Sequence, residues 1–243
     1  RLLARCGAAL YEVLLGVQEP LELLFPEGDA TTATEQHTAA AGAVAMNGLL
    51  HQVVQDAVAH LPAERGIRIV EIGAGTGGTT AGLLPRLSPE RTEYLFTDIG
   101  PTFLQQARAR FADYPFVRYQ PLDIERAPVT QGFAPQQADL VIAANVLHAT
   151  RDLAETLAHV RQLLQPGGQL LLLEATTPSR WVDLTFGLTT GWWRFADQRQ
   201  EHPLLTAAQW QALLLEHGFQ AVETIEQGGQ AVIIAQTAAS TVT

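Results

Sequence analysis

Two kinds of hydrophobic pattern alternate along most of this chain. Between residues 67 and 174, short apolar runs with the length of buried strands are separated by stretches in which apolar residues recur every three or four positions. Strands and helices that alternate in this way predict a parallel sheet with right-handed crossover connections. We therefore expect an α/β fold whose core is a mostly parallel sheet.

The segment before this core has a purely helical pattern. Residues 1–62 carry helix-type spacing, with loop interruptions at Gly16 and Pro20. We expect an N-terminal helical lid or cap over residues 1–62 and a core domain over residues 63–237.

The pattern changes twice more after residue 174. Residues 177–203 break the alternation of strands and helices, which indicates an insertion. Residues 219–225 alternate apolar and polar positions, and a glycine pair separates them from the apolar run 231–235. This spacing predicts an antiparallel hairpin that closes the sheet at one edge.

A glycine-rich segment, residues 71–78, joins the first strand to the helix after it. Gly73, Gly75 and Gly77 allow a sharp turn and a close approach of the backbone to a ligand. The free N–H groups and the positive dipole end of the next helix favour a polar or anionic ligand there. The pattern fits G-x-G-x-x-G of dinucleotide-binding proteins and also E-x-G-x-G-x-G of S-adenosylmethionine-dependent methyltransferases. The glycine spacing alone leaves both cofactors open.

Polar side chains stand at the ends of the strands that follow. Asp98 ends the second strand, at about the distance from Glu71 that suits a carboxylate holding ribose hydroxyls. Asp123 ends the third strand and Asn145 the fourth. Because ligands of open α/β sheets bind beyond the carboxyl ends of the strands, we expect these side chains to share one site with Glu174 at the end of the fifth strand.

The approach to the fifth strand favours one of the two cofactors. Residues 163–174 read as a helix end, a turn at Pro166-Gly167 and a strand, in the form L-x-P-G-G-x-L-L-L that is common in methyltransferases and uncommon in nicotinamide enzymes. We therefore predict S-adenosyl-L-methionine, with S-adenosyl-L-homocysteine as its product, and keep a nicotinamide oxidoreductase as the remote alternative. The predicted cofactor-binding residues are Glu71, Gly73, Gly75, Gly77, Asp98, Ile99, Asp123, Ile124 and Asn145.

A histidine and a glutamate make a candidate base. His148 lies on the loop after the fourth strand, and Glu174 lies at the end of the strand expected beside it. A carboxylate next to an imidazole fixes its tautomer and raises its basicity, so the pair could take an acidified carbon-bound proton. In the structural alternative, His148 bonds a backbone carbonyl and Glu174 caps the next helix.

The insertion offers further candidates with a plain alternative for each. The adjacent Trp192 and Trp193 either wall a substrate pocket or simply pack the insertion. Arg194 and Arg199 either bind a phosphate or carboxylate of a substrate or are solvated surface arginines.

Composition and charge exclude several classes of protein. Hydrophobic residues make up 47% of the chain and charged residues 16%, which supports a sizeable core. A net charge of −10 and scattered basic residues argue against nucleic acid as a partner, and the longest apolar runs are too short for a membrane span. The single cysteine, Cys6, favours a reducing compartment, for which we expect the cytoplasm. The other histidines lack metal-ligand spacing, so we expect no metal.

Several blocks of sequence together carry a resemblance to a known family. They lie at residues 70–80, 94–99, 122–125, 131–133, 144–150, 191–193 and 203–205. With them the chain resembles, over about residues 20–225, the carbon-methyltransferase domains embedded in polyketide synthases. The resemblance implies the class I methyltransferase fold, which is Rossmann-like, with a seven-stranded, mostly parallel sheet.

The resemblance also implies a reaction and partners. The family's His and Glu, matched by His148 and Glu174, deprotonate the α-carbon of a β-ketoacyl thioester, and the enolate attacks the sulfonium methyl. The acyl chain is carried on the phosphopantetheine of an acyl carrier protein within the parent synthase. For substrate binding we assign Trp192, Trp193 and His37.

One stretch departs from the family. Residues 36–46 are rich in alanine, where the family has aromatic residues before the position of Asn47. This departure leaves a catalytically weakened domain with a structural role in a synthase as one alternative. An oxygen methyltransferase on the same fold is the other, because a base and a methyl donor serve a hydroxyl group equally well.

Overall fold

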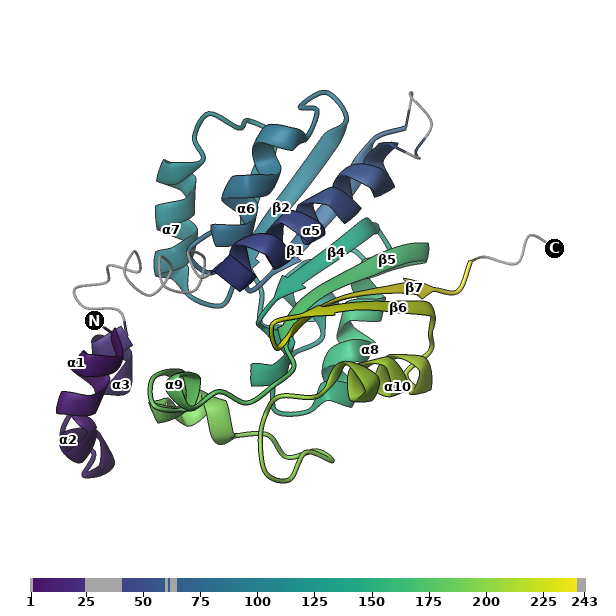
Figure 1. The fold of residues 1–243 in the computed structure, drawn as a ribbon. Helices are drawn as coiled ribbons and strands as arrows, with labels where there is room; N and C mark the ends of the chain where they lie inside the picture. The colour runs from purple at the N-terminus through teal and green to yellow at the C-terminus, as the bar shows by residue number, and fades with distance from the viewer. Residues whose placement is uncertain (1, 25–40, 60, 62–64, 240–243) are drawn as a thin grey trace.

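A seven-stranded sheet forms the centre of the molecule in the computed structural model, which describes residues 2–24, 41–59, 61 and 65–239 (Figure 1). The strand order is β3-β2-β1-β4-β5-β7-β6. Strands β1 to β5 pair in parallel, and β7 runs antiparallel to both β5 and β6. The predicted sheet and its closing hairpin are confirmed. The strands are β1 Ile67–Ile72, β2 Thr92–Asp98, β3 Val117–Pro121, β4 Ala138–Ala144, β5 Leu164–Ala175, β6 Phe219–Gln227 and β7 Gln230–Thr237.

Helices cover both faces of this sheet. The helices of the described residues are α1 Leu2–Ala8, α2 Leu10–Leu14, α3 Pro20–Leu24, α5 Ala41–Ala59, α6 Gly78–Leu83, α7 Pro101–Arg110, α8 Leu153–Leu163, α9 Arg180–Asp183 and α10 Ala207–Glu216. Figure 1 shows α5, α6 and α7 over one face and α8 and α10 over the other. The 3₁₀ turns are η2 Leu84–Arg86, η3 Pro128–Gln131, η4 Leu147–Ala149, η5 Phe186–Leu188 and η6 Thr190–Trp193.

The central strands are apolar on both sides because each face buries a separate core. Ile69 and Ile142 face the cluster that contains Leu50 of α5. Val70 and Val141, one position along the same two strands, face the other cluster, built on α8 and α10. Side chains alternate across a strand, so a strand buried on both faces needs a continuous apolar run. The sequence pattern of these strands follows from that requirement.

The turn predicted at Pro166-Gly167 is wrong, because this segment belongs to β5. Its pairing with β4 shifts between Ala138 and Leu140, which marks an irregularity of the ladder. Gly167 takes the left-handed φ of 75° there. Glycine adopts this conformation at little cost. A glycine in the sequence is therefore compatible both with a turn and with a bulged strand, and does not distinguish them.

The N-terminal segment makes two different contacts. Leu2 and Cys6 of α1 and Leu24 of α3 form a small apolar cluster against Phe186 and Leu188 of the insertion. Helix α5 instead packs its apolar side against the sheet. The predicted helical character is confirmed for the described residues, and the division of the chain at residue 62 stays a prediction.

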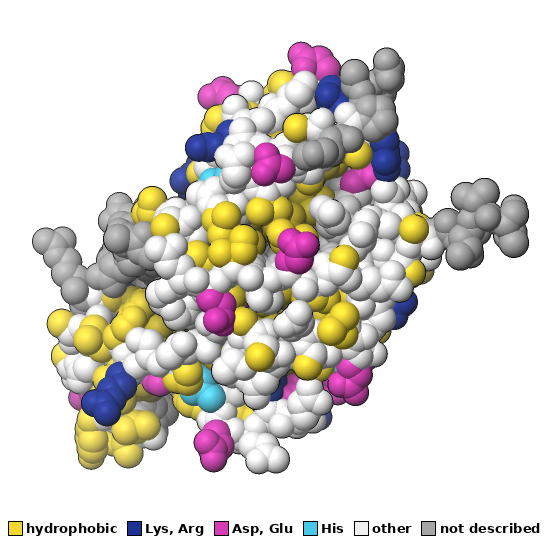
Figure 2. All heavy atoms as spheres, turned by 45° about the vertical axis from the view of Figure 1, so that its right-hand side comes forward, with side chains coloured by type: hydrophobic (Ala, Val, Ile, Leu, Met, Phe, Trp, Pro, Cys, Tyr) yellow, Lys and Arg dark blue, Asp and Glu magenta, His cyan; other side chains and the backbone are white. Residues whose placement is uncertain are grey.

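The outer surface of α1, α2 and α3 is rich in apolar side chains (Figure 2). Tyr11, Leu14, Leu15 and Val17 are all more than half exposed. None of the helices in the described part of the chain is both long and apolar enough to cross a membrane.

Candidate active site

The glycine-rich turn after β1 has the backbone that its sequence predicts. Gly73, Gly75 and Gly77 have φ values of 59°, 54° and 76°, in the left-handed region. A Cβ at Gly73 would lie 2.7 Å from the methyl groups of Val146, and one at Gly77 would lie 2.7 Å from the ring of Phe111. Glycine is therefore needed twice over, for the conformation and for the space. The result is a tight loop at the carboxyl end of the central strand.

Glu71 supports this loop from beneath. Its side chain is buried, and its Oε2 accepts hydrogen bonds from the hydroxyl groups of Thr80, at 2.5 Å, and Tyr94, at 2.6 Å. Burial raises the pKa of Glu71 to about 7, although the two hydrogen bonds lower it. The carboxyl group thus ties β1, β2 and α6 together, and its predicted contact with the cofactor stays a prediction.

Asp98, the last residue of β2, faces the glycine turn. Its Oδ2 accepts from the backbone N–H of Gly75 at 2.9 Å, and its Oδ1 accepts from the N–H of Gly100 at 2.7 Å. Burial raises the pKa of this carboxyl group, and the backbone hydrogen bonds oppose the shift. The next side chain, Ile99, is 68% exposed, which leaves an apolar surface beside the carboxylate.

Gln131 fixes the backbone after β3. Its Oε1 accepts from the N–H of Asp123 at 2.9 Å, and its Nε2 donates to the carbonyl of Asp123 at 2.8 Å. The side chain of Asp123 accepts from the N–H of Glu125, while Ile124 is buried in the core. The sequence marked Gln131 only as part of a family block, and the structure gives it a positioning task.

Asn145 ends β4 in a conformation that few residues adopt. Its φ is 55°, its N–H donates to the carbonyl of Leu173 at 2.7 Å, and its Oδ1 accepts from the N–H of Ala175 at 3.1 Å. Asparagine tolerates the left-handed region better than most residues with a side chain. Asn145 therefore links the ends of β4 and β5 and turns the chain toward His148.

The predicted neighbours His148 and Glu174 are in contact. His148 Nδ1 lies 2.5 Å from Glu174 Oε2, and both side chains are buried. Glu174 Oε1 accepts from the N–H of Leu147 at 2.9 Å and from that of Val146 at 3.3 Å. Glu174 thus caps the short turn η4, as the structural alternative predicted, but His148 Nδ1 contacts Glu174 and not a backbone carbonyl. The catalytic role of the pair stays a prediction. With Nδ1 held by the carboxylate, Nε2 is left as the group that can exchange a proton.

The two tryptophans differ in their relation to His148. The ring of Trp192 lies 5.2 Å from that of His148, edge to face at 71°, and its side chain is buried. Trp193 is 47% exposed, and its indole N–H donates to the carbonyl of Gly187 at 2.6 Å. Both indole rings pack against His202, whose Nε2 lies 3.0 Å from Asp183 Oδ1. Trp192 therefore packs against one side of the His148 imidazole, the candidate base.

Arg199 is neither a surface arginine nor a free binding group. Its side chain is fully buried and pairs with Asp197 at 2.7 Å, while Arg194 is half exposed and pairs with Glu125 at 2.9 Å. Arg199 also donates to backbone carbonyls of the loop that carries His148. Neither role proposed from the sequence for Arg199 is correct. The sequence contains no signal for this contact, because it joins segments about fifty residues apart.

Other predictions concern residues or groups away from this cluster. His37 lies outside the described residues, so its predicted contact with substrate stays a prediction. Among the residues that the structure describes, no three His, Cys, Asp or Glu side chains are grouped to hold a metal ion.

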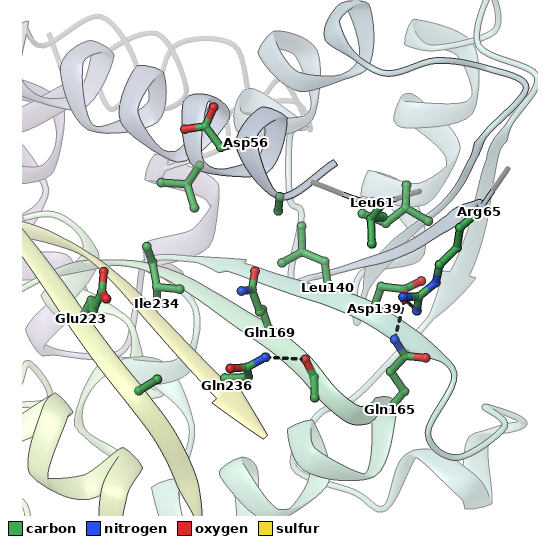
Figure 3. A pocket seen from close by; sticks show the side chains of 15 residues that line it. Asp56, Leu61, Arg65, Asp139, Leu140, Gln165, Gln169, Glu223, Ile234 and Gln236 are labelled. Carbon is green, nitrogen blue, oxygen red and sulfur yellow. Dashed lines mark hydrogen bonds and ion pairs between the residues drawn. The ribbon is translucent and has the colours of Figure 1, made fainter. Parts of the chain in front are cut away.

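A cavity of about 600 Å³ lies beside the amino ends of the parallel strands, at the opposite end of the strands from His148 and Glu174 (Figure 3). It is open to solvent on one side and is lined by the last turns of α5, by the first residues of β1, β4 and β5, and by residues of β6 and β7. Arg65 and Asp139 form an ion pair on its wall, and Gln236 donates to the carbonyl of Gly167. None of its lining residues is a predicted site residue, so we do not assign the reaction to it.

Comparisons with known proteins identify the family of this chain. A family model described as a methyltransferase domain matches residues 70–170. The non-reducing polyketide synthase mapC of Penicillium roqueforti is 38% identical over 96% of this chain. The highly reducing polyketide synthase of Leptosphaeria maculans is 40% identical over 90% of it. The chain spans only about a tenth of the length of these two synthases, 10% and 9%.

Solved structures extend the comparison from the sequence to the fold. The CurJ carbon methyltransferase is 52% identical, with a TM-score of 0.95 over 98% of this chain and 66% of its own. The CMeT domain of the citrinin polyketide synthase is 33% identical, with a TM-score of 0.90 over 98% of this chain and 65% of its own. The trans-methyltransferase CalH, solved with S-adenosylhomocysteine, is 35% identical, with a TM-score of 0.81 over 96% of this chain and 66% of its own. The chain therefore belongs to the class I, S-adenosylmethionine-dependent methyltransferases, as a domain similar to the carbon-methyltransferase domains of polyketide synthases.

Proposed function

We propose that this domain methylates the α-carbon of a β-ketoacyl thioester that an acyl carrier protein carries on its phosphopantetheine. The observation that carries the proposal is the buried contact of 2.5 Å between His148 Nδ1 and Glu174 Oε2. It supports a base whose orientation is fixed at the carboxyl edge of the sheet, where open α/β sheets bind their ligands.

The residues at this edge fit S-adenosylmethionine. The glycine turn brings backbone N–H groups to the start of α6, and Asp98 offers a carboxylate for hydroxyl groups of a ribose. Ile99 exposes an apolar side chain next to it, suited to a flat ring. When bound, the cofactor supplies an electrophilic methyl group on a sulfonium.

The reaction needs a proton removed from carbon before the methyl is transferred. In a β-ketoacyl thioester two carbonyl groups flank the α-carbon and acidify its proton, so an imidazole is a strong enough base. His148 Nε2 takes the proton, and the C–H electrons move into the enolate, which makes the α-carbon the nucleophile. This carbon would receive the methyl group of the bound cofactor, whose sulfur would keep the electrons of the bond that breaks. Glu174 holds Nδ1–H and balances the charge of the imidazolium.

Trp192 limits the space around this base. Its edge-to-face contact at 5.2 Å covers one side of the buried imidazole and so shields that side from water. The geometry thus supports transfer to a soft carbon nucleophile that is generated within the site.

Mass spectrometry of the product tests the proposal. We expect a β-ketoacyl pantetheine thioester, incubated with the domain and S-adenosylmethionine, to gain one or more methyl groups on the α-carbon. A β-hydroxyacyl thioester serves as the control and should remain largely unmodified, because it has a single acidifying carbonyl. A methyl found on oxygen would favour an oxygen methyltransferase, and no transfer by a domain that binds the cofactor would favour a structural role.

The partners follow from the same proposal. We propose an acyl carrier protein as the carrier of the substrate and the other domains of a parent synthase as neighbours of this one. The single cysteine, Cys6, which is buried and unpaired, agrees with action in the cytoplasm.

A further inference from the structure

The loop that carries His148 is held from two opposite sides. Glu174 of β5 holds it from the sheet, through the imidazole and the N–H groups of Val146 and Leu147. Residues 194–199 of the insertion hold it from the other side. There the N–H of Ala196 donates to the carbonyl of Arg151 at 2.8 Å.

Arg199 provides most of the second attachment. Its Nη1 donates to the carbonyl of His148 at 2.7 Å, and its Nη2 donates to the carbonyl of Thr150 at 2.6 Å. Its Nε and Nη2 also bind the two carboxylate oxygens of Asp197, at 2.8 and 2.7 Å. The guanidinium therefore binds the backbone within η4, at His148, and just after it, at Thr150, and uses its fork geometry in full.

Asp197 completes the arrangement and anchors it to the fold. Its Oδ2 accepts from the N–H of Leu153, at the first residue of α8, at 2.9 Å. Burial raises the pKa of Asp197, but hydrogen bonds from Arg199 and from the backbone outweigh this effect and lower it overall. The carboxylate thus stays charged beside the buried cation and fixes it relative to α8.

A buried ion pair of this kind adds little net stability, because both ions lose their hydration. The backbone carbonyls that accept hydrogen bonds from Arg199, however, are that of His148 itself and that of Thr150, two residues later. A shift of the η4 backbone would move the imidazole off Glu174 and turn Nε2 away from the α-carbon. Proton transfer depends on such placement to within a fraction of an ångström.

We propose that Arg199, oriented by Asp197, is a positioning residue that fixes the His148 loop for proton abstraction. This inference rests on the proposed function, since it acts through His148. Arginine is required here, because the ammonium group of a lysine cannot reach two carbonyls and both oxygens of Asp197 in one plane.

The test measures two quantities for Arg199→Lys and for the milder Asp197→Asn. The first is exchange of the α-proton of a β-ketoacyl pantetheine thioester in D₂O without S-adenosylmethionine, and the second is the affinity for S-adenosylmethionine. We expect the exchange rate to fall about ten- to a hundredfold in Arg199→Lys and less in Asp197→Asn. Cofactor affinity should stay within about twofold of that of the parent, because neither substitution touches the glycine turn. This measurement also shows that each variant is folded.

Arg161→Lys is the matched control. Arg161 also donates to a backbone carbonyl, that of His217 at 3.1 Å, but this contact lies on the surface between α8 and α10. We expect its exchange rate to equal that of the parent. A second comparison uses His148→Ala, where no base remains to be positioned. Adding Arg199→Lys to His148→Ala should then leave the residual exchange unchanged.

The outcomes separate this inference from the function on which it rests. A parent domain that neither exchanges nor methylates the α-carbon overturns both. A parent that does so, together with an Arg199→Lys variant of equal rate, overturns the positioning role alone. Arg199→Lys could also lower the exchange rate by the same factor in the His148→Ala background as in the parent. Alternatively, Arg199→Lys and Asp197→Asn could both lose cofactor affinity along with exchange. Either result would assign Arg199 to the stability of the fold and would also overturn the inference.

Discussion

The two halves of the candidate site are built in different ways. The half proposed to bind the cofactor, called the cofactor half, consists of turns that directly follow β1, β2 and β3, where Gly73, Asp98 and Asp123 stand at or just after the strand ends. The half around His148 is assembled from β5 and the insertion, through contacts to Glu174 and Arg199. Local turns can be read from short motifs, whereas contacts between distant segments depend on the whole fold. The comparison predicts that substitutions in the two halves should affect different measurements.

The largest effect should come from the base itself. We expect His148→Ala to lower methyl transfer by about 10²- to 10⁴-fold, because no other group replaces a positioned general base. Glu174→Gln should do less harm, since an amide still accepts hydrogen bonds from the η4 backbone but supplies no charge. Steady-state kinetics measures both losses, and calorimetry of S-adenosylmethionine binding should show little change. If His148→Ala lost cofactor affinity by as large a factor as methyl transfer, the two halves would not act separately.

Glu71 should make the stability of the cofactor half depend on pH. Its pKa is about 7 in the folded chain and 4.5 as a reference, so the folded state holds the proton more tightly. The stabilisation is fully present below about pH 4.5 and is lost as the pH rises through about 7, by about 3 kcal/mol in total. In Glu71→Gln this contribution should vanish. Denaturant unfolding between pH 4.5 and 8 checks it, and identical pH profiles of parent and variant would contradict the assignment.

A substitution of Asp98 should weaken cofactor binding and leave removal of the α-proton almost unchanged. We expect Asp98→Ala to weaken S-adenosylmethionine binding by about 1.5–3 kcal/mol, or roughly ten- to a hundredfold, because a charged acceptor is lost. Exchange of the α-proton in the absence of cofactor should continue at nearly the parental rate. Calorimetry and exchange on the same preparation give both values. Unchanged affinity, or saturable binding of NAD by the parent, would contradict the assignment of this carboxylate.

A pair of glycine substitutions gives the smallest effects, with opposite signs. Gly73→Ala should destabilise the chain by about 1–3 kcal/mol and weaken cofactor binding, since its Cβ meets Val146 at 2.7 Å and its φ is 59°. Gly48 lies within α5 with nothing inside 4 Å of an added Cβ. Gly48→Ala should therefore stabilise the chain by about 0.5–1 kcal/mol. Thermal unfolding compares the two, and equal shifts would rule out the predicted crowding at Gly73.

The sequence predicted the sheet, its edge hairpin and the meeting of His148 with Glu174. The last was possible because β4 and β5 are consecutive parallel strands, whose carboxyl ends must meet at one edge. The contact of Arg199 with the His148 loop was not predictable, because the insertion has no periodicity that fixes its path. The strand through Gly167 was missed because a turn and a bulge demand the same glycine.

The most direct test of the account is deuterium exchange at the α-carbon of a β-ketoacyl pantetheine thioester, without S-adenosylmethionine. It isolates the half of the site around His148 from the half that we propose binds the cofactor. We predict that the parent domain accelerates exchange and that His148→Ala does not, while both bind S-adenosylmethionine equally well. Exchange that is as fast in His148→Ala as in the parent, or a parent that methylates the substrate on oxygen, would contradict the central claim that His148 generates a carbon nucleophile.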